Sequence, residues 1–243
     1  MQKLVCLAMI LILAGCSGES FRKTLETFGQ GVEGGPAPLS SAEVAQGLKE
    51  ALVLGAERAV ASSSIRDGFY KNPRLFIPFP EEAAAVRQTA LNLGLRSQVD
   101  RFEENLNRAA EEAVREATPI FVNAITSMSI QDAFGILNGG PNAATIFLRS
   151  RTEAELMERF RPEADKAVNS VELTKYWSPL AQAYNTASVF TGAQAVNPDL
   201  VGYVSENALD GLFLLVADEE ARIREEPAAR VSELLRRVFG SVD

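Results

Sequence analysis

The stretch between residues 97 and 128 carries a continuous apolar stripe at helical spacing, and it constrains the fold more than any other part of the chain. Its apolar residues recur every three or four positions, on one face of a helix: Val99, Phe102, Leu106, Ala109, Ala113, Ala117, Ile120, Ala124 and Met128. Ser97 with Asp100 predicts an N-terminal capping box, and Pro119 predicts a kink or two helices meeting end to end. Such a helix, roughly 45 Å long if straight, is the expected centre of the fold.

Capping signals predict further helices on both sides of this stretch. The predicted N-termini share a capping residue or an early proline: Ser40 with Glu43, Ser129 with Asp132, Thr152 with Glu155, Thr174, Asn197 before Pro198, and Ser205. Gly94 is expected to end a helix over 81–93, and Pro162 is expected to interrupt another. Gly55, inside the helix that begins near Ser40, indicates a close contact with a second helix.

Strand signals are nearly absent. Leu75–Ile77 is the only strand-like piece, and the prolines around it restrict it to an edge or an extended loop. The run 208–217 is apolar nearly all round, which is typical of a central helix. The sequence therefore predicts an all-α fold, a multi-helix bundle with long central helices and at most one short extended segment.

Composition excludes several kinds of function. The chain has 243 residues, a formal net charge of −8 and a sequence pI near 4.9, and this length fits one domain with a substantial core. It contains no histidine, which excludes Ser-His-Asp and Cys-His catalysis and imidazole metal sites. The acidic balance argues against a nucleic-acid partner. We expect no metal and no cofactor.

The N-terminus has the pattern of a cleavable signal. Lys3 precedes Leu4–Leu13, an apolar run of signal-peptide length that is too short for a membrane span. The run ends in Leu-Ala-Gly-Cys at residues 13–16, which resembles the lipobox of bacterial lipoproteins. The resemblance implies cleavage before Cys16, a thioether lipid on its sulfur and acylation, for example by palmitate, of the new N-terminus. The alternative is an ordinary secretory signal with a chance cysteine.

This interpretation divides the chain into three parts. Residues 1–15 are the expected signal peptide, 16–38 a lipidated N-terminus and flexible tether, and 39–243 a helical domain. The expected location is the cell envelope, on the periplasmic face of the outer membrane, because Ser17 rather than aspartate follows the lipobox-like cysteine. The membrane is then one partner, reached through the lipid.

Short motifs across the body of the chain resemble one protein family. They are Gly47–Leu52, Asn107–Glu111, Met128–Ile130 with Asp132 and Ala133, Ile136 and Leu137 before Gly139 and Gly140, Asn142–Thr145, Thr174–Tyr176, Tyr203 and Val204, Ala208–Phe213, and Glu219 and Glu220 before Ile223 and Arg224. The set resembles the bacterial lipoproteins grouped as domain of unknown function 4197. The resemblance implies a helical domain and the location of a lipoprotein in the cell envelope. It implies no catalytic residues.

The first candidate site is the glycine-rich turn at 139–145. Free backbone N–H groups at a helix start attract anions, and glycines let a ligand approach closely. The residues that would form a phosphate or carboxylate pocket are Gly139, Gly140, Asn142, Thr145 and Arg149, and Arg151 also lies downstream of the turn. The alternative is purely structural: a helix end, a tight turn and the next helix start.

Carboxylates supply the other polar candidates. Asp210 lies in the apolar run and is expected to be buried, as a catalytic or ligand-binding carboxylate. The structural alternative is a salt bridge to an arginine or a bond to a neighbouring helix start. Glu111 and Glu112 could serve in acid–base chemistry or bind a cation. The alternative for such charges is pairing on a solvated helix face at i,i+4: Glu104–Arg108, Glu111–Arg115, Asp218–Arg222 and Glu220–Arg224.

Three aromatic residues, Tyr176, Trp177 and Tyr184, form a candidate surface for ligands or protein partners, with core packing as the alternative. Taken together, these features favour non-catalytic binding of an envelope protein or a small anionic ligand. The alternative function is a hydrolase that uses carboxylate acid–base chemistry on an envelope polymer.

Overall fold

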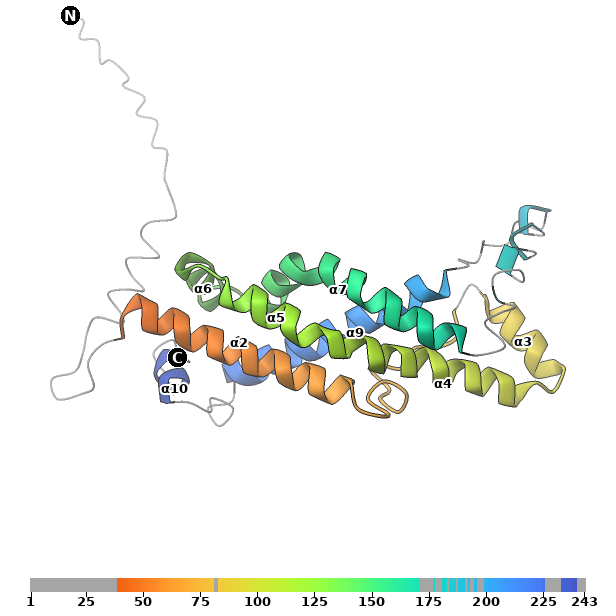
Figure 1. The fold of residues 1–243 in the computed structure, drawn as a ribbon, viewed down its shortest axis with the longest axis horizontal. Helices are drawn as coiled ribbons and strands as arrows, with labels where there is room; N and C mark the ends of the chain where they lie inside the picture. The colour runs from red at the N-terminus through yellow and green to blue at the C-terminus, as the bar shows by residue number, and fades with distance from the viewer. Residues whose placement is uncertain are drawn as a thin grey trace, which may run out of the picture.

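The fold is an elongated bundle of helices and contains no strand among its described residues, which confirms the predicted all-α class. The computed structural model describes residues 39–80, 83–170, 199–225 and 233–239, with several positions between 177 and 195. The elements are α2 (Ser41–Ser63), α3 (Ala84–Asn92), α4 (Arg96–Ala113), a 3₁₀ turn η2 (Val114–Glu116), α5 (Ala117–Thr126), α6 (Ile130–Leu137), α7 (Ala143–Asn169), α9 (Leu200–Glu225) and α10 (Glu233–Phe239). The long helices run along the long axis, with α3 at one end and α6 and α10 at the other (Figure 1).

The predicted central stripe forms a rod made of α4, η2 and α5. Eight of its nine predicted positions are buried and Ala124 is partly buried. The 3₁₀ turn precedes Pro119 and joins the two helices end to end, as predicted. The predicted cap at Ser97 is wrong. Gly94, at φ +79°, turns the chain so that α4 already begins at Arg96, and the Ser97 hydroxyl bonds Gln98 instead.

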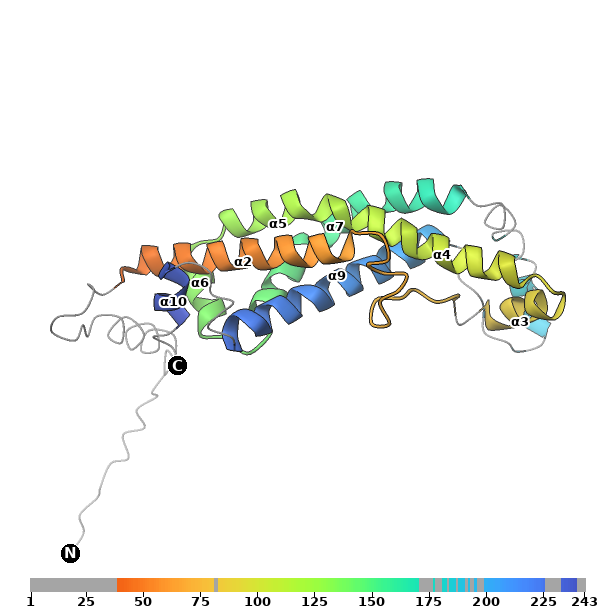
Figure 2. The same ribbon diagram turned by 90° about the horizontal axis from the view of Figure 1, so that it is seen from below.

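Helix α2 begins and packs as the sequence predicts. The Ser40 N–H donates to Glu43 Oε2 at 2.8 Å, and the Glu43 N–H donates to Ser40 Oγ at 3.3 Å. A Cβ added at Gly55 would lie 3.4 Å from Glu219 Cβ of α9, so the expected close helix contact is present. The view in Figure 2 shows α9 running beside α2 along the bundle.

Helix α7 is longer than predicted, and the expected breaks at Thr152 and Pro162 are wrong. Its buried side chains recur every four residues along its whole length: Ala144, Leu148, Thr152, Leu156, Phe160, Ala164 and Val168. This stripe packs against α4 and α9. Thr152 is inside the helix and donates its hydroxyl to the Leu148 carbonyl at 2.8 Å. Packing along the full stripe therefore outweighs the local cost of the exposed Pro162.

Helix α9 is the central apolar helix. It begins after Asp199, whose Oδ1 accepts the Gly202 N–H at 2.8 Å. Asn197 and Pro198 lie outside the described residues. The predicted restart at Ser205 is wrong, because Ser205 is buried within α9 and bonds the Val201 carbonyl. By length and composition α9 could cross a membrane. However, 56% of its most apolar 18-residue stretch is buried inside the bundle, as is typical of a core helix.

The connection after α2 is held by side-chain hydrogen bonds and contains no strand. The buried Asn107 amide accepts the Ile77 N–H and donates to the Ile77 carbonyl, both at 2.8 Å. These two bonds satisfy both backbone groups of Ile77 in place of a neighbouring strand. Phe69 and Leu75 from the same connection are buried against the Cα of Gly211 in α9.

Candidate functional site

The start of α7, predicted to attract an anion, is occupied by a carboxylate of the protein itself. Glu220 of α9 accepts the Ala144 N–H at 3.0 Å and the Thr145 N–H at 2.8 Å. The Thr145 hydroxyl donates to the same carboxylate at 2.8 Å, and Arg224 pairs with it at 2.8 Å. The helix start thus has the predicted affinity for negative charge, and Glu220 supplies that charge.

Residues 139–142 of the glycine-rich turn are exposed. A Cβ at Gly139 would lie 2.5 Å from Ala143 Cβ, so this position needs glycine for close packing. Gly140 and Asn142 lie at the surface, and the Asn142 side chain makes no capping bond with α7. Binding of an external ligand by this turn stays a prediction.

Asp210 is not buried, which corrects the sequence-based expectation. Its side chain is 65% exposed and pairs with Arg149, one of the other predicted ligand-binding residues. The Arg149 guanidinium also lies over the Phe213 ring, 5.3 Å from its centroid. Asp210 is on the outer face of α9, whereas its sequence neighbours Leu209, Gly211 and Leu212 are buried.

The pair Glu111 and Glu112 is divided between the interior and the surface. Glu111 is buried, and its Oε1 accepts the N–H groups of Phe69 and Tyr70 at 3.1 and 3.2 Å. Its Oε2 pairs with Arg108 at 2.8 Å rather than with Arg115. Glu112 is 52% exposed in its side chain and pairs with Arg115. The two carboxylates therefore do not converge on one site.

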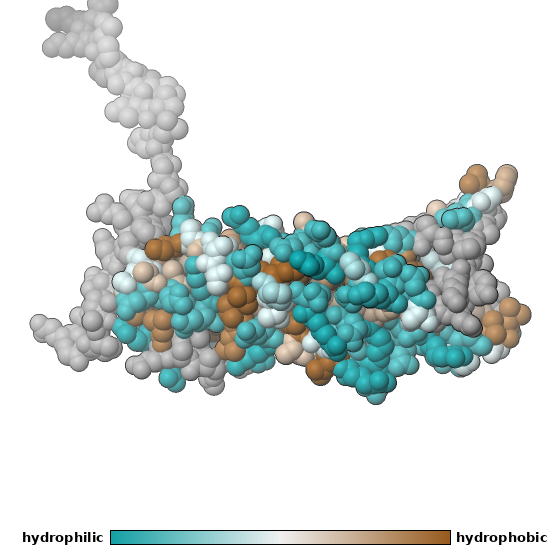
Figure 3. Space-filling model, in the orientation of Figure 1, coloured by the Kyte–Doolittle hydropathy of each residue, from teal (hydrophilic) through white to brown (hydrophobic). Residues whose placement is uncertain are grey.

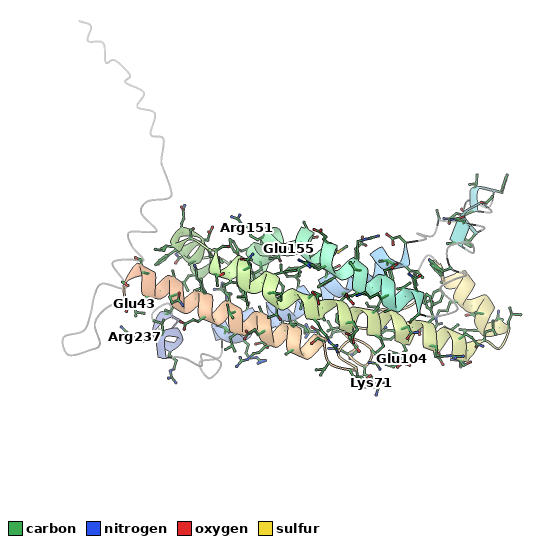
Figure 4. All side chains as sticks on the ribbon, in the orientation of Figure 1. Glu43, Lys71, Glu104, Arg151, Glu155 and Arg237 are labelled. Carbon is green, nitrogen blue, oxygen red and sulfur yellow. The ribbon has the colours of Figure 1, made fainter. Side chains whose placement is uncertain are left out.

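Arg108 joins Glu111 to the connection after α2. It pairs with Asp67 at 2.6 Å and with Glu104 at 3.1 Å, and its guanidinium lies 5.1 Å from the Tyr70 ring centroid. Burial disfavours the charge, but the three carboxylate partners outweigh it and raise the pKa of Arg108 above its ordinary value. Figure 4 labels Glu104 and Lys71, which lie at the edge of this cluster. The cluster fastens a loop to α4.

Trp177 belongs to the core. Its ring centroid lies 5.7 Å from that of Phe79 and 5.9 Å from that of Phe102, and its side chain is buried. Tyr184 is partly buried against the same core, and Tyr176 lies outside the described residues. The structural interpretation of these aromatics is therefore confirmed for Trp177.

A pocket of about 220 Å³ lies between α5, the turn before α6, and α7. Its apolar lining comes from Ile120, Ala124, Met128 and Phe147. Its polar lining comes from Asn123, Ser127, Asp132, Arg151, Thr152 and Glu155. Figure 4 labels Arg151 and Glu155, both on the part of α7 near α6.

The charged groups of this pocket differ in how they are held. Ser129 donates its hydroxyl and its N–H to Asp132 Oδ2, at 2.7 and 2.9 Å, and these bonds lower the pKa of Asp132. The Arg151 guanidinium lies 5.5 Å from the Phe147 ring centroid. Among the described residues, neither Arg151 nor Glu155 has an ion-pair partner within 4 Å. The pocket therefore presents a cation and an anion that make no direct ion pair, and the positive charge of Arg151 is near enough to Asp132 to help lower the pKa of that carboxyl.

The sequence did not reveal this pocket. The sequence predicts Asp132 only as a helix cap, and Glu155 only as part of a capping box that does not form. Arg151 and Glu155 are four residues apart on one continuous helix, so the sequence could place them on the same face of α7. It could not show that α5 lies opposite them, because that depends on tertiary packing. In the part of the chain that the structure describes, no group of three acidic or thiol side chains is arranged to hold a metal ion.

The fold and pocket define an all-α domain with a small pocket that is lined by both apolar and charged side chains. The chain belongs to the family described as protein of unknown function DUF4197, whose sequence model matches residues 38–240. No curated protein and no solved structure matches the chain.

Proposed function

We propose that this protein is a lipid-anchored envelope protein whose helical domain binds a small ligand that carries an anionic group. The ligand occupies the pocket between α5, α6 and α7 and pairs with Arg151. Binding is non-catalytic, and the ligand is released unchanged. The lipid-bearing residue is Cys16, and the anchoring membrane is the outer membrane, on its periplasmic side.

The unpaired guanidinium of Arg151 is the observation that carries the binding proposal. Most other arginines of the bundle pair with a carboxylate, as Arg108, Arg149 and Arg224 do. Arg151 instead lines a pocket with its charge held over Phe147. A planar guanidinium suits bidentate binding of a carboxylate or phosphate. This pocket therefore replaces the turn at 139–145 as the better anion site, because Glu220 already fills the helix start there.

A hydrolase is the second candidate, and one observation favours it: Asp132 and Glu155 line the same pocket. General acid catalysis needs a carboxyl group that is protonated near neutral pH. The bonds from Ser129 lower the pKa of Asp132 and occupy its Oδ2. Asp132 is thus suited to capping α6 rather than to giving a proton, and binding remains the function that the geometry supports better.

A protein partner would need a continuous apolar surface. The large apolar side chains that are exposed are single residues or pairs spread over several parts of the chain: Ile65, Leu93 with Leu95, Ile130, Ile146, Val189 with Phe190, and Leu214. Figure 3 shows apolar residues scattered among polar ones over the visible face. The pocket is accordingly the feature on which we base the proposal.

Two experiments test the two parts of the proposal. Metabolic labelling with a fatty-acid probe should mark the wild-type protein and leave a Cys16→Ala variant unmarked. An unmarked wild-type protein would refute the lipid anchor.

For the pocket, thermal shifts with a panel of small carboxylates and phosphates should appear with the wild type and disappear in Arg151→Gln. Arg159→Gln is the matched control, because Arg159 is an exposed arginine of α7 that does not line the pocket. Equal shifts in both variants would refute the site.

A further inference from the structure

The pocket also carries a negative group without a partner. Glu155 lies four residues after Arg151 on α7, a spacing at which oppositely charged side chains commonly pair. They do not pair here. The order with the cation first is the less favourable one on a helix, and the Arg151 guanidinium is directed back one turn to the Phe147 ring.

The two charges face the same small volume. Arg151 and Glu155 both line the pocket, together with apolar side chains from α5 and α7, Ile120 and Phe147 among them. Asn123 adds a side-chain amide that makes no hydrogen bond within the described residues. A ligand with only negative charge would satisfy Arg151 and would leave Glu155 unpaired beside it, an electrostatic cost that grows as the ligand displaces water.

We propose that the ligand is a zwitterion of the size of an α-amino acid, with an apolar side chain; this inference rests on the binding function proposed above. Its carboxylate pairs with Arg151, its ammonium group pairs with Glu155, and its side chain lies on Ile120 and Phe147. The second carboxylate, Asp132, is already bonded to Ser129 and lies near the positive charges of Arg151 and Lys49. Glu155 is therefore the better partner for an ammonium group.

The volume sets the size of the ligand. At about 220 Å³ the pocket exceeds the roughly 15 Å³ that one water needs. It is smaller than the roughly 300–1,000 Å³ that is typical of pockets for drug-sized molecules. A single amino acid fits between these limits, whereas a peptide or a saccharide chain would extend into solvent.

The experiment compares three probes that share one apolar body and differ in charge. Isothermal titration calorimetry is performed on the full-length protein in lipid nanodiscs with leucine, N-acetylleucine and leucinamide, using both enantiomers of leucine. The first probe carries both charges, the second only the negative one and the third only the positive one. Leucine in at least one enantiomer should bind at least tenfold more tightly than either derivative.

Variants identify the site. Arg151→Gln and Glu155→Gln should each weaken leucine binding at least tenfold, and Arg159→Gln should leave it unchanged. Both pocket residues are exposed and make no ion pair, so unchanged melting temperatures confirm that the variants fold. A different result would be that N-acetylleucine binds as tightly as leucine and that only Arg151→Gln weakens this binding. It would overturn the proposal of a zwitterionic ligand but would still support the binding of an anionic group.

Two other results would overturn the inference in different ways. If no probe binds, or if leucine binding is insensitive to Arg151→Gln, the proposed function of the pocket fails together with the zwitterion. O-Phosphoethanolamine serves as a fourth probe, because a lipid headgroup is another source of a small zwitterion. Tighter binding of this probe than of leucine would overturn the assignment to an apolar amino acid.

Discussion

At the scale of single residues, Glu111 is the clearest example of a buried charge with a structural role. It accepts two backbone N–H groups and pairs with Arg108. Glu111→Gln leaves Arg108 without its most buried partner and should lower the free energy of unfolding by about 2–4 kcal/mol. Urea denaturation measures this change. Glu112→Gln, at the exposed neighbour, should change it by less than about 0.5 kcal/mol, and equal effects at the two positions would contradict the described network.

Two helical glycines should respond to alanine with opposite signs. A Cβ at Gly211 would lie 2.8 Å from Cε1 of the fully buried Phe69, whereas a Cβ at Gly55 meets its nearest neighbours at 3.4 Å. Alanine improves helix propensity by about 1 kcal/mol at either position, but overpacking costs about 1–3 kcal/mol. Gly55→Ala should therefore raise the melting temperature and Gly211→Ala should lower it. A stabilised Gly211→Ala would show that the connection at 64–80 does not pack on α9 as described.

At the scale of elements, α7 shows where local signals fail. Thr152 with Glu155 and then Pro162 suggest separate helices, and each signal is valid for an isolated peptide. The stripe of buried residues at every fourth position is the stronger signal, because it continues on both sides of Pro162. By contrast, the caps at Ser40 and Ser129 were predictable, since their partners lie three residues away and no tertiary contact competes.

The proline in α7 gives a test at this scale. Pro162 is exposed in the middle of a continuous helix and lacks the N–H that would bond the carbonyl one turn earlier. Pro162→Ala should raise the free energy of unfolding by about 1–3 kcal/mol, as measured by urea denaturation. A loss of stability would mean that the proline ring makes a contact that the helix needs.

The candidate sites could be predicted only in part, because they depend on contacts between helices that are distant in the sequence. The affinity of the α7 N-terminus for an anion follows from backbone geometry alone, but its occupant, Glu220, comes from a helix 75 residues further along. Asp210 appeared buried because its sequence neighbours are apolar, although only one side of α9 faces the core there. The pocket needs α5 and α7 side by side, and a pattern within one segment does not predict that pairing.

At the scale of the whole molecule, the lack of histidine predicts how stability depends on pH. Histidine is the side chain whose ordinary pKa lies between pH 6 and 8, and the chain has none. The free energy of unfolding should therefore be nearly constant across this range. Bonds from Ser40 lower the pKa of Glu43, and bonds from Ser129 lower that of Asp132. These groups stabilise the fold fully above their unfolded pKa values, about 4, and their contribution is lost as the pH falls through the lower folded values.

Urea denaturation at a series of pH values checks this prediction. The free energy of unfolding should decline below about pH 4, and Asp132→Asn should make that decline shallower. A steep change between pH 6 and 8 would contradict the account, which attributes the flat profile to the lack of histidine.

The whole molecule combines a predicted lipid anchor with a bundle whose described pocket presents unpaired charges of both signs. A crystal structure of the protein grown with leucine tests this claim most directly. The account predicts leucine in the pocket between α5, α6 and α7, with its carboxylate on Arg151 and its ammonium group on Glu155. An empty pocket, or leucine bound with neither charge paired to these two residues, would contradict it.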